Sequence, residues 1–154
     1  MKLVAAALVL LALAGCGGGS DGLGAGDVKR LAQLASVRLG GQVLSVAWSP
    51  DGRELAAANQ DGVVRIWDVR KRKLVRRLRG HTGWTRGVDW SPNGDLIATS
   101  GADGMIRVWD AGNGKELRVV RAGGQEAWSV PWSPDGERLV SADGDGTVRI
   151  WGLR

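Results

Sequence analysis

Two columns of tryptophan repeat along the chain at a constant interval of 42 residues. Within each repeat the two tryptophans stand 19 residues apart, and no insertion or deletion disturbs this spacing. The first column is Trp48, Trp90 and Trp132, and the second is Trp67, Trp109 and Trp151. A period of this length is typical of stacked supersecondary units, each of which buries its apolar face against a neighbour. The sequence therefore predicts a short repeat array with three copies of one unit.

Each repeat carries the signals of short antiparallel strands rather than helices. The strands expected in the first copy are residues 43–48, 55–58, 63–67 and 74–78. Ser49-Pro50 begins one turn because proline presets φ, and Asp61-Gly62 forms the tight turn of a hairpin. The second and third copies are expected to follow the same course. The predicted fold class is therefore all-β, with one short helix conceivable over residues 28–35.

The first 27 residues lie outside the repeats and have a different composition. Residues 3–14 form an unbroken apolar run, which is too short to span a bilayer and has the length of a secretory signal. A leucine and two small residues precede Cys16, the only cysteine, and this motif resembles the lipobox of bacterial lipoproteins. The resemblance implies a lipoprotein signal peptide over residues 1–15 and a lipid on Cys16. The alternative is an ordinary secretory signal.

Residues 16–27 are rich in glycine and are predicted to form a flexible tether. Its r.m.s. reach is roughly 18 Å by random-coil scaling. A lipid on Cys16 would then hold the repeats close to a membrane surface. The expected location is the bacterial cell envelope. It would be the outer membrane if the host has one and otherwise the outer face of the plasma membrane.

Four motifs of the second copy indicate a particular repeat family. They are Gly80-His81, Trp90-Ser91-Pro92-Asn93-Gly94, Asp103-Gly104 and Ile106-Arg107-Val108-Trp109-Asp110. Together with four strands per repeat, they resemble the WD40 family of β-propellers. The resemblance implies three four-stranded antiparallel blades that form an open or partial propeller over residues 28–154. The repeats would cover about residues 38–79, 80–121 and 122–154.

The same resemblance implies a buried hydrogen-bond network of histidine, serine or threonine, aspartate and tryptophan in each blade. Its members in the second copy are His81, Thr99, Asp103 and Trp109. The third copy has Gly123 where the histidine would stand, and the first has Leu39. Because buried polar groups need partners, we expect the middle blade to be the most stable.

Three blades are fewer than the about 4–8 that close a propeller. Residues 34–39 are expected to form an additional outer strand before the first repeat. Both end faces of the array would then expose apolar side chains, as interfaces do. Besides a lone open arc, two explanations stay open. The chain is a fragment of a longer WD40 protein, or it is a half-propeller that forms a homo-oligomer through these faces in a purely structural role.

Two tryptophans, Trp84 and Trp128, stand outside the columns and are candidate binding residues. The candidates on one rim of the propeller are Trp84, Arg86, Trp128 and Leu44. Tryptophan and arginine are favoured anchors of protein interfaces. The alternative is that these side chains only cover the neighbouring blade. The six columnar tryptophans are expected to be core residues.

Seven basic residues lie between Arg70 and Arg79 and account for most of the formal net charge of +5. Anionic lipid is one ligand that such a run could bind, and nucleic acid is not expected as a partner. The alternative is an outer strand whose charges prevent sheet-to-sheet pairing.

Little in the composition points to catalysis. One histidine and one cysteine cannot build a zinc site, so no metal, cofactor or catalytic residue is predicted. Glycine-rich matches to hydrolase and nucleotide-binding motifs fall in residues 17–22, outside the strand and helix context that those motifs need. The sequence therefore predicts a non-enzymatic, membrane-anchored scaffold that binds another protein of the cell envelope.

Overall fold

The computed structural model describes residues 33–152, and all of its regular elements within this range are strands. The chain divides into two units, Met1–Val37 and Arg38–Arg154, and the strands belong to the second. The segments expected to form the signal peptide and tether, with Cys16, lie outside the described residues. So does most of the conceivable helix over residues 28–35, of which residues 33–35 are not helical. Within the described part of the chain, no helix could cross a membrane.

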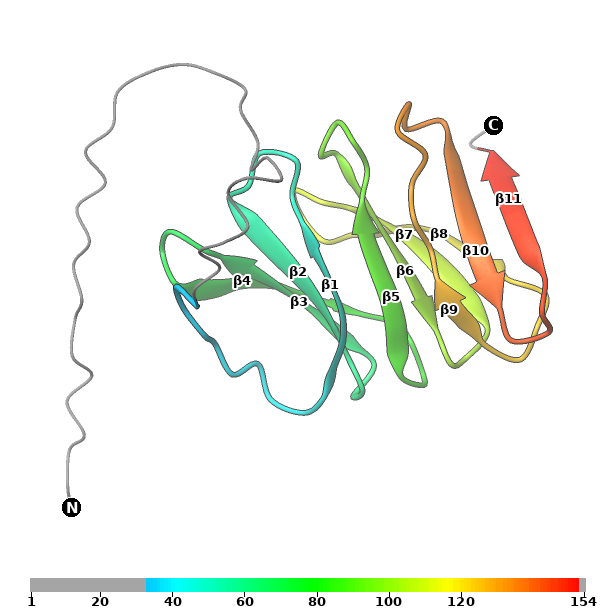
Figure 1. The fold of residues 1–154 in the computed structure, drawn as a ribbon, viewed down its shortest axis with the longest axis horizontal. Helices are drawn as coiled ribbons and strands as arrows, with labels where there is room; N and C mark the ends of the chain where they lie inside the picture. Colours follow the sequence, from blue (N-terminus) through cyan, green and yellow to red (C-terminus); the bar gives the residue numbers. More distant parts are fainter. Residues whose placement is uncertain (1–32, 153–154) are drawn as a thin grey trace. The chain divides into compact units, whose positions relative to one another are not determined.

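The strands form three antiparallel sheets, each built from strands that are consecutive in the chain (Figure 1). The first sheet contains β1 (Val43–Trp48), β2 (Glu54–Asn59), β3 (Val63–Asp68) and β4 (Lys73–Arg79). The second contains β5 (Thr85–Trp90), β6 (Leu96–Gly101), β7 (Met105–Asp110) and β8 (Glu116–Arg121). The third contains β9 (Ala127–Ser129), β10 (Arg138–Asp143) and β11 (Val148–Gly152). The expected all-β fold of three antiparallel sheets is confirmed.

A serine hydroxyl shapes the turn after the first strand of each sheet. Ser49 Oγ lies 2.7 Å from a carboxylate oxygen of Asp51 and accepts the amide N–H of Glu54 at 2.9 Å. Ser91 and Ser133 make the equivalent bonds in the other two sheets. Gly52 takes a φ of 66°, which only glycine adopts without strain. The repeated Ser-Pro dipeptide therefore marks a turn held by its own side chains.

The third sheet departs from the expectation of a full four-stranded blade. It has three strands among the described residues, and its first strand covers only Ala127–Ser129. Pro131 follows two residues later and has no amide N–H to donate to the strand ladder. The pairing resumes at a single bridge between Trp132 and Leu139. Proline therefore shortens the strand that the repeat pattern predicts.

Each sheet has two chemically different faces, which we call the tryptophan face and the aliphatic face. The tryptophan face carries both columnar tryptophans of the repeat, as Trp90 and Trp109 do in the second sheet. The aliphatic face carries the alternate residues, such as Val64 and Ile66 of β3 in the first sheet.

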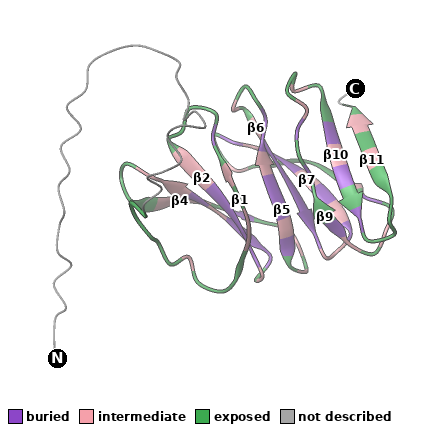
Figure 2. Cartoon of the chain, in the orientation of Figure 1, coloured by how far each residue is buried: buried purple, intermediate pink, exposed green. Residues whose placement is uncertain are grey.

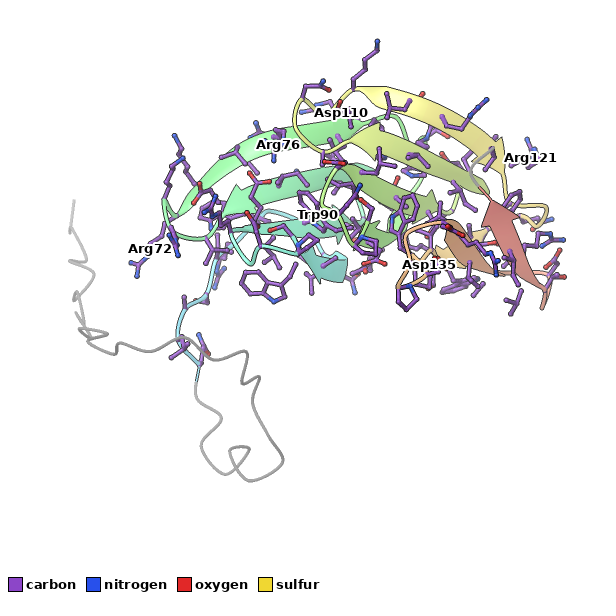
Figure 3. All side chains as sticks on the ribbon, turned by 90° about the horizontal axis from the view of Figure 1, so that it is seen from above. Arg72, Arg76, Trp90, Asp110, Arg121 and Asp135 are labelled. Atoms are coloured by element: carbon purple, nitrogen blue, oxygen red, sulfur yellow. The ribbon has the colours of Figure 1, made fainter. Side chains whose placement is uncertain are left out.

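The two interior layers form where a tryptophan face packs on the aliphatic face of the sheet before it. One layer joins Val64 and Ile66 of the first sheet to Trp90 and Trp109 of the second. The other joins the second sheet to Trp132 and Leu139 of the third. Trp90 points into the space between the first two sheets (Figure 3), and the central strands are the most deeply buried (Figure 2). The core is therefore divided between two equivalent interfaces.

The expectation that all six columnar tryptophans are core residues is wrong in the first sheet, where Trp67 is only partly buried and Trp48 is exposed. Its side chain is 57% exposed, whereas the equivalent Trp90 is 7% exposed. Trp90 is covered by the aliphatic face of the first sheet, and no described sheet covers the tryptophan face on which Trp48 stands. The burial of a columnar tryptophan thus depends on the neighbouring sheet rather than on its own repeat.

The expectation of an outer strand over residues 34–39 is also wrong. These residues have no regular secondary structure. A strand needs a partner for its amide and carbonyl groups, and none of the described strands pairs with this segment. Its partner in a closed propeller would be β11, which pairs with β10 alone among the described strands.

Candidate binding surface

Four side chains of the second sheet form one continuous hydrogen-bond network. The Trp109 indole N–H donates to Thr99 Oγ1 at 2.9 Å, and Thr99 lies 2.9 Å from His81 Nε2. The opposite ring nitrogen, Nδ1, lies 2.9 and 3.0 Å from the two carboxylate oxygens of Asp103. With Thr99 donating to Nε2, the histidine is neutral and carries its proton on Nδ1. The network ties the loop before β5 to the β6–β7 hairpin.

Asp103 also accepts two backbone bonds, which makes it the centre of this network. The amide N–H of Thr82 lies 3.1 Å from Oδ2, and that of Met105 lies 3.1 Å from Oδ1. Burial alone would raise the pKa of Asp103, but the hydrogen bonds from His81 and the two amides outweigh it and lower the pKa. The carboxylate therefore stays ionised and holds three donors in place.

Burial lowers the pKa of His81 below its usual 6.5, although the Asp103 carboxylate pulls in the opposite direction. Arg107 adds to the lowering, and Glu116 opposes it. A buried neutral histidine must gain a charge when it is protonated in the folded state. The unfolded chain therefore binds the proton more readily than the folded chain does.

The free energy of unfolding is expected to decrease as the pH falls below about 6.5. The unfolded state binds more protons in this range, so the contribution of His81 is complete above its unfolded pKa and is lost progressively below it. One proton limits the slope to about 1.4 kcal/mol per pH unit. Urea unfolding of the full chain between about pH 7.5 and about pH 5 measures this slope.

A His81→Asn variant is the control for this prediction, because the chain has no other histidine. The variant should be less stable at neutral pH and should lose most of the slope over the same range. An equal slope in both proteins would show that His81 is not the titrating group.

An arginine column follows the same 42-residue period, and the sequence reasoning missed it. Its members are Arg65, Arg107 and Arg149, each four residues after the hairpin aspartate. In the first sheet Arg65 contacts both carboxylate oxygens of Asp61, at 2.6 and 3.0 Å. The repeated Asp-Gly-x-x-Arg spacing is the signal that could have revealed this pair.

The arginine changes partner where the histidine is present. In the second sheet His81 hydrogen-bonds the Asp103 carboxylate. Arg107 instead bonds Glu116 at 2.5 Å and lies 3.7 Å from Asp103. In the third sheet, which has no histidine, Arg149 lies 2.8 Å from Asp145. Hydrogen bonds from this guanidinium hold the pKa of that carboxyl well below its usual range.

At two further equivalent positions, the second and third sheets differ in which one carries a glycine and which one a larger side chain. A Cβ atom on Gly101 would stand 2.5 Å from His81 Nδ1, so the glycine makes room for the imidazole. At the equivalent position the third sheet has Asp143, which is buried and bonds Arg149 at 2.5 Å. Its Gly123 replaces the histidine, and a Cβ there would stand 2.6 Å from the Arg149 guanidinium carbon. The two sheets thus fill one space in alternative ways.

The structure brings together Trp84, Arg86 and Trp128, which we call the rim surface. The Arg86 guanidinium carbon lies 3.9 Å from the ring centre of Trp128 and 5.3 Å from that of Trp84. Glu126 fixes it further with a 2.9 Å ion pair. The two indoles remain 43% and 51% exposed for Trp84 and Trp128, so this stacked group faces outward.

The first strands β1, β5 and β9 run side by side, and a cavity of about 390 Å³ lies along them. Leu44, Arg86 and Trp128 all line it, together with Asp89 and Pro131. Three of the four binding candidates therefore share one cavity, and Trp84 joins them through its contact with Arg86.

The basic run lies on the outer edge of the first sheet. It occupies the β3–β4 turn and β4, the edge strand of the sheet, where Figure 3 labels Arg72 and Arg76. Arg76 pairs with Glu54, and Lys71 pairs with Asp68 at 3.4 Å. This placement fits either charge protection of an edge strand or contact with an anionic surface.

Metal-binding clusters of three or more His, Cys, Asp or Glu are absent from the described residues. The neighbouring carboxylates of Asp143 and Asp145 are both engaged by Arg149. The rim surface offers two indole rings that contact one arginine, and this arginine is ion-paired. Such a group suits recognition of another molecule better than acid–base chemistry.

The model of the family described as WD domain, G-beta repeat matches three stretches of the chain. These are residues 34–68, 72–110 and 114–152. Together they cover well over half of the sequence. Each matched stretch contains one pair of columnar tryptophans.

Individual relatives share shorter segments of this chain. The WD repeat-containing protein VIP3 of Arabidopsis thaliana is 51% identical over 39 residues, which are 25% of this chain and 12% of that protein. The uncharacterized WD repeat-containing protein alr2800 of Nostoc sp. is 46% identical over 48 residues, 31% of this chain and 4% of that protein. The general transcriptional corepressor TUP1 of Saccharomyces cerevisiae is 42% identical over 55 residues, 36% and 8% of the two chains. The matches thus span a small part of each relative.

Proposed function

Because this chain belongs to the WD domain, G-beta repeat family, we propose that it is a non-enzymatic scaffold that binds a protein partner through its rim surface. Repeats of this kind present extended surfaces built on a rigid array, and function then lies in the side chains on that surface. The partner is expected to be another protein of the cell envelope.

The observation that supports this proposal is the stacking of Arg86 between Trp84 and Trp128. The stack and the ion pair with Glu126 fix three large side chains before any partner arrives, which reduces the entropy lost on binding. Tryptophan and arginine are also the residues that most often dominate the binding energy of an interface. The rim surface is therefore a preorganised anchor.

The same contacts could instead serve only to join the second and third sheets. Arg86 belongs to β5, whereas Glu126 and Trp128 belong to the third repeat, so the stack crosses the boundary between them. A purely structural role predicts a loss of stability when the indoles are removed. A binding role predicts a loss of affinity, because roughly half of each indole is not covered by the protein itself.

We also propose that Cys16 is lipidated after removal of residues 1–15, and that residues 16–27 tether the scaffold to a membrane of the bacterial cell envelope. The support for this part is the sequence pattern of an apolar run that ends at a single cysteine. A lipid anchor would restrict the rim surface to partners near that membrane. It would raise their effective concentration without any additional contact.

Trp84→Ala and Trp128→Ala are each expected to weaken capture of the envelope partner by about tenfold or more. The measurement is crosslinking and affinity purification of the full chain from membranes of its host, followed by titration of the captured protein. In the same experiment, Cys16→Ser should move the scaffold out of the membrane fraction and reduce capture.

Leu117→Ala is the matched control, because Leu117 is an exposed apolar residue on β8 outside the rim surface. It should leave capture unchanged. If the tryptophan variants lower the melting temperature by many degrees and bind as well as the wild type, the rim surface only joins two sheets. Unchanged membrane attachment of the Cys16 variant would overturn the anchor but leave the binding proposal standing.

A further inference from the structure

Two sheet faces remain uncovered among the described residues, and they stand at opposite ends of the array. At one end is the tryptophan face of the first sheet, on which Val46 is 59% and Trp48 is 57% exposed. At the other end is the aliphatic face of the third sheet, on which Val148 is 67% and Ile150 is 70% exposed. Both faces carry large apolar side chains on regular strands, as interfaces between protein layers do.

Each exposed residue has equivalents that are buried inside the same chain. Val46 corresponds to Val88, which is 6% exposed on the tryptophan face of the second sheet. Ile150 corresponds to Ile66 and Val108, which are 0% and 6% exposed on the aliphatic faces of the first and second sheets. These positions carry similar residue types on covered and uncovered faces. Their difference in exposure therefore comes from the presence or absence of a neighbouring sheet.

The shape that fits each uncovered face is also present in the structure. A tryptophan face packs on an aliphatic face twice within the chain, once around Trp90 and once around Trp132. The complement of the uncovered tryptophan face is thus an aliphatic face like that of the third sheet. The complement of the uncovered aliphatic face is a tryptophan face like that of the first sheet.

We infer that the two end faces bind each other between two copies of this chain, the tryptophan face of one copy packing on the aliphatic face of the other. The interface continues the packing that the chain already makes twice internally, so no new kind of contact is needed. If both ends of both copies engage, two molecules supply six sheets and the contact closes under two-fold symmetry. Six lies within the about 4–8 blades of closed propellers.

Head-to-tail packing makes a prediction that other modes of association do not share. Val46→Asp places a charge on the tryptophan face alone, and Ile150→Asp places one on the aliphatic face alone. Each variant by itself should remain monomeric, because every contact between two identical copies contains one damaged face. A mixture should form a 1:1 dimer, because the intact aliphatic face of the first variant meets the intact tryptophan face of the second.

The measurement is light scattering on the full chain in a non-ionic detergent, with the detergent mass subtracted. The wild type is expected to be a dimer, and each variant should dissociate about 30-fold more readily or worse. Leu117→Asp is the matched control, since it adds the same charge at an exposed apolar strand position outside both faces. Circular dichroism checks that all variants keep their strands.

A wild-type monomer at about 100 µM would overturn the inference, because it would place the Kd of the contact above that concentration. So would a mixture of the two variants that stays monomeric while the wild type associates. Neither result would affect the rim surface, because Trp84 and Trp128 lie on neither end face. A wild-type protein that is a dimer but captures no partner would count against the rim surface alone.

Discussion

Asp103→Ala is expected to lower the free energy of unfolding by about 3–5 kcal/mol, one of the two largest effects of any single replacement considered for this chain. The carboxylate accepts bonds from His81 and from the amides of Thr82 and Met105. Alanine would leave these donors without their partner in a site that is mostly closed to water, and each orphaned donor costs about 1–3 kcal/mol. Urea unfolding of the full chain at neutral pH, followed by tryptophan fluorescence, measures the loss.

Asp61→Ala is the matched control for this prediction. Asp61 occupies the equivalent hairpin position in the first sheet, but its side chain is about half exposed and its main partner is Arg65. Water can replace these bonds, so the expected loss is below about 1 kcal/mol. Equal losses at Asp61 and Asp103 would show that the buried histidine network is not the source of the effect.

Gly101→Ala is expected to destabilise the protein by about 3 kcal/mol, although alanine adds only one methyl group. The new Cβ would stand 2.5 Å from His81 Nδ1 and 2.8 Å from Asp103 Oδ1, so the imidazole or the hairpin must move. The φ of Gly101 is not positive, so the glycine is required for space rather than for backbone conformation. Gly83→Ala, where the nearest neighbours would be at 3.4 Å, should be nearly neutral.

A paired replacement tests whether the second and third sheets fill one space in alternative ways. His81→Gly together with Gly101→Asp gives the second sheet the residue types that the third has at Gly123 and Asp143. Arg107 is then free to turn from Glu116 towards the carboxylates, as Arg149 does. The double variant should be more stable than the sum of the two single losses predicts, with a coupling energy of about 1–3 kcal/mol. Additive losses would mean that the two arrangements are unrelated.

Much of the fold follows from the sequence because its signals are local and repeated. Residues 43–48 form β1 with the predicted bounds, and the Ser-Pro turn and Asp-Gly hairpin lie between the expected strands. These features depend on φ preferences, side-chain alternation and short-range hydrogen bonds, all of which act within about ten residues. The resemblance to the WD40 family also implied the four residues that the structure joins into the network of the second sheet.

The candidate site could be predicted from the sequence only in part. The sequence singled out Trp84, Arg86 and Trp128 as tryptophans outside the columns and an arginine at the same rim. It did not show that Arg86 stacks on Trp128 of the next repeat and pairs with Glu126, because these contacts join residues about forty positions apart. The partner change of Arg107 was also missed, because it depends on whether His81 already bonds the Asp103 carboxylate.

The sequence by itself determined the repeat, its strands, its turns and the types of residue on each sheet face. Only the tertiary structure decided which of those faces are buried. Trp48 and Trp90 occupy the same position of the repeat before the same Ser-Pro turn, yet one residue is 57% and the other 7% exposed. Burial is a property of two surfaces in contact, and a local pattern specifies only one of them. The next sheet supplies the other surface, and for Trp48 no described sheet does so.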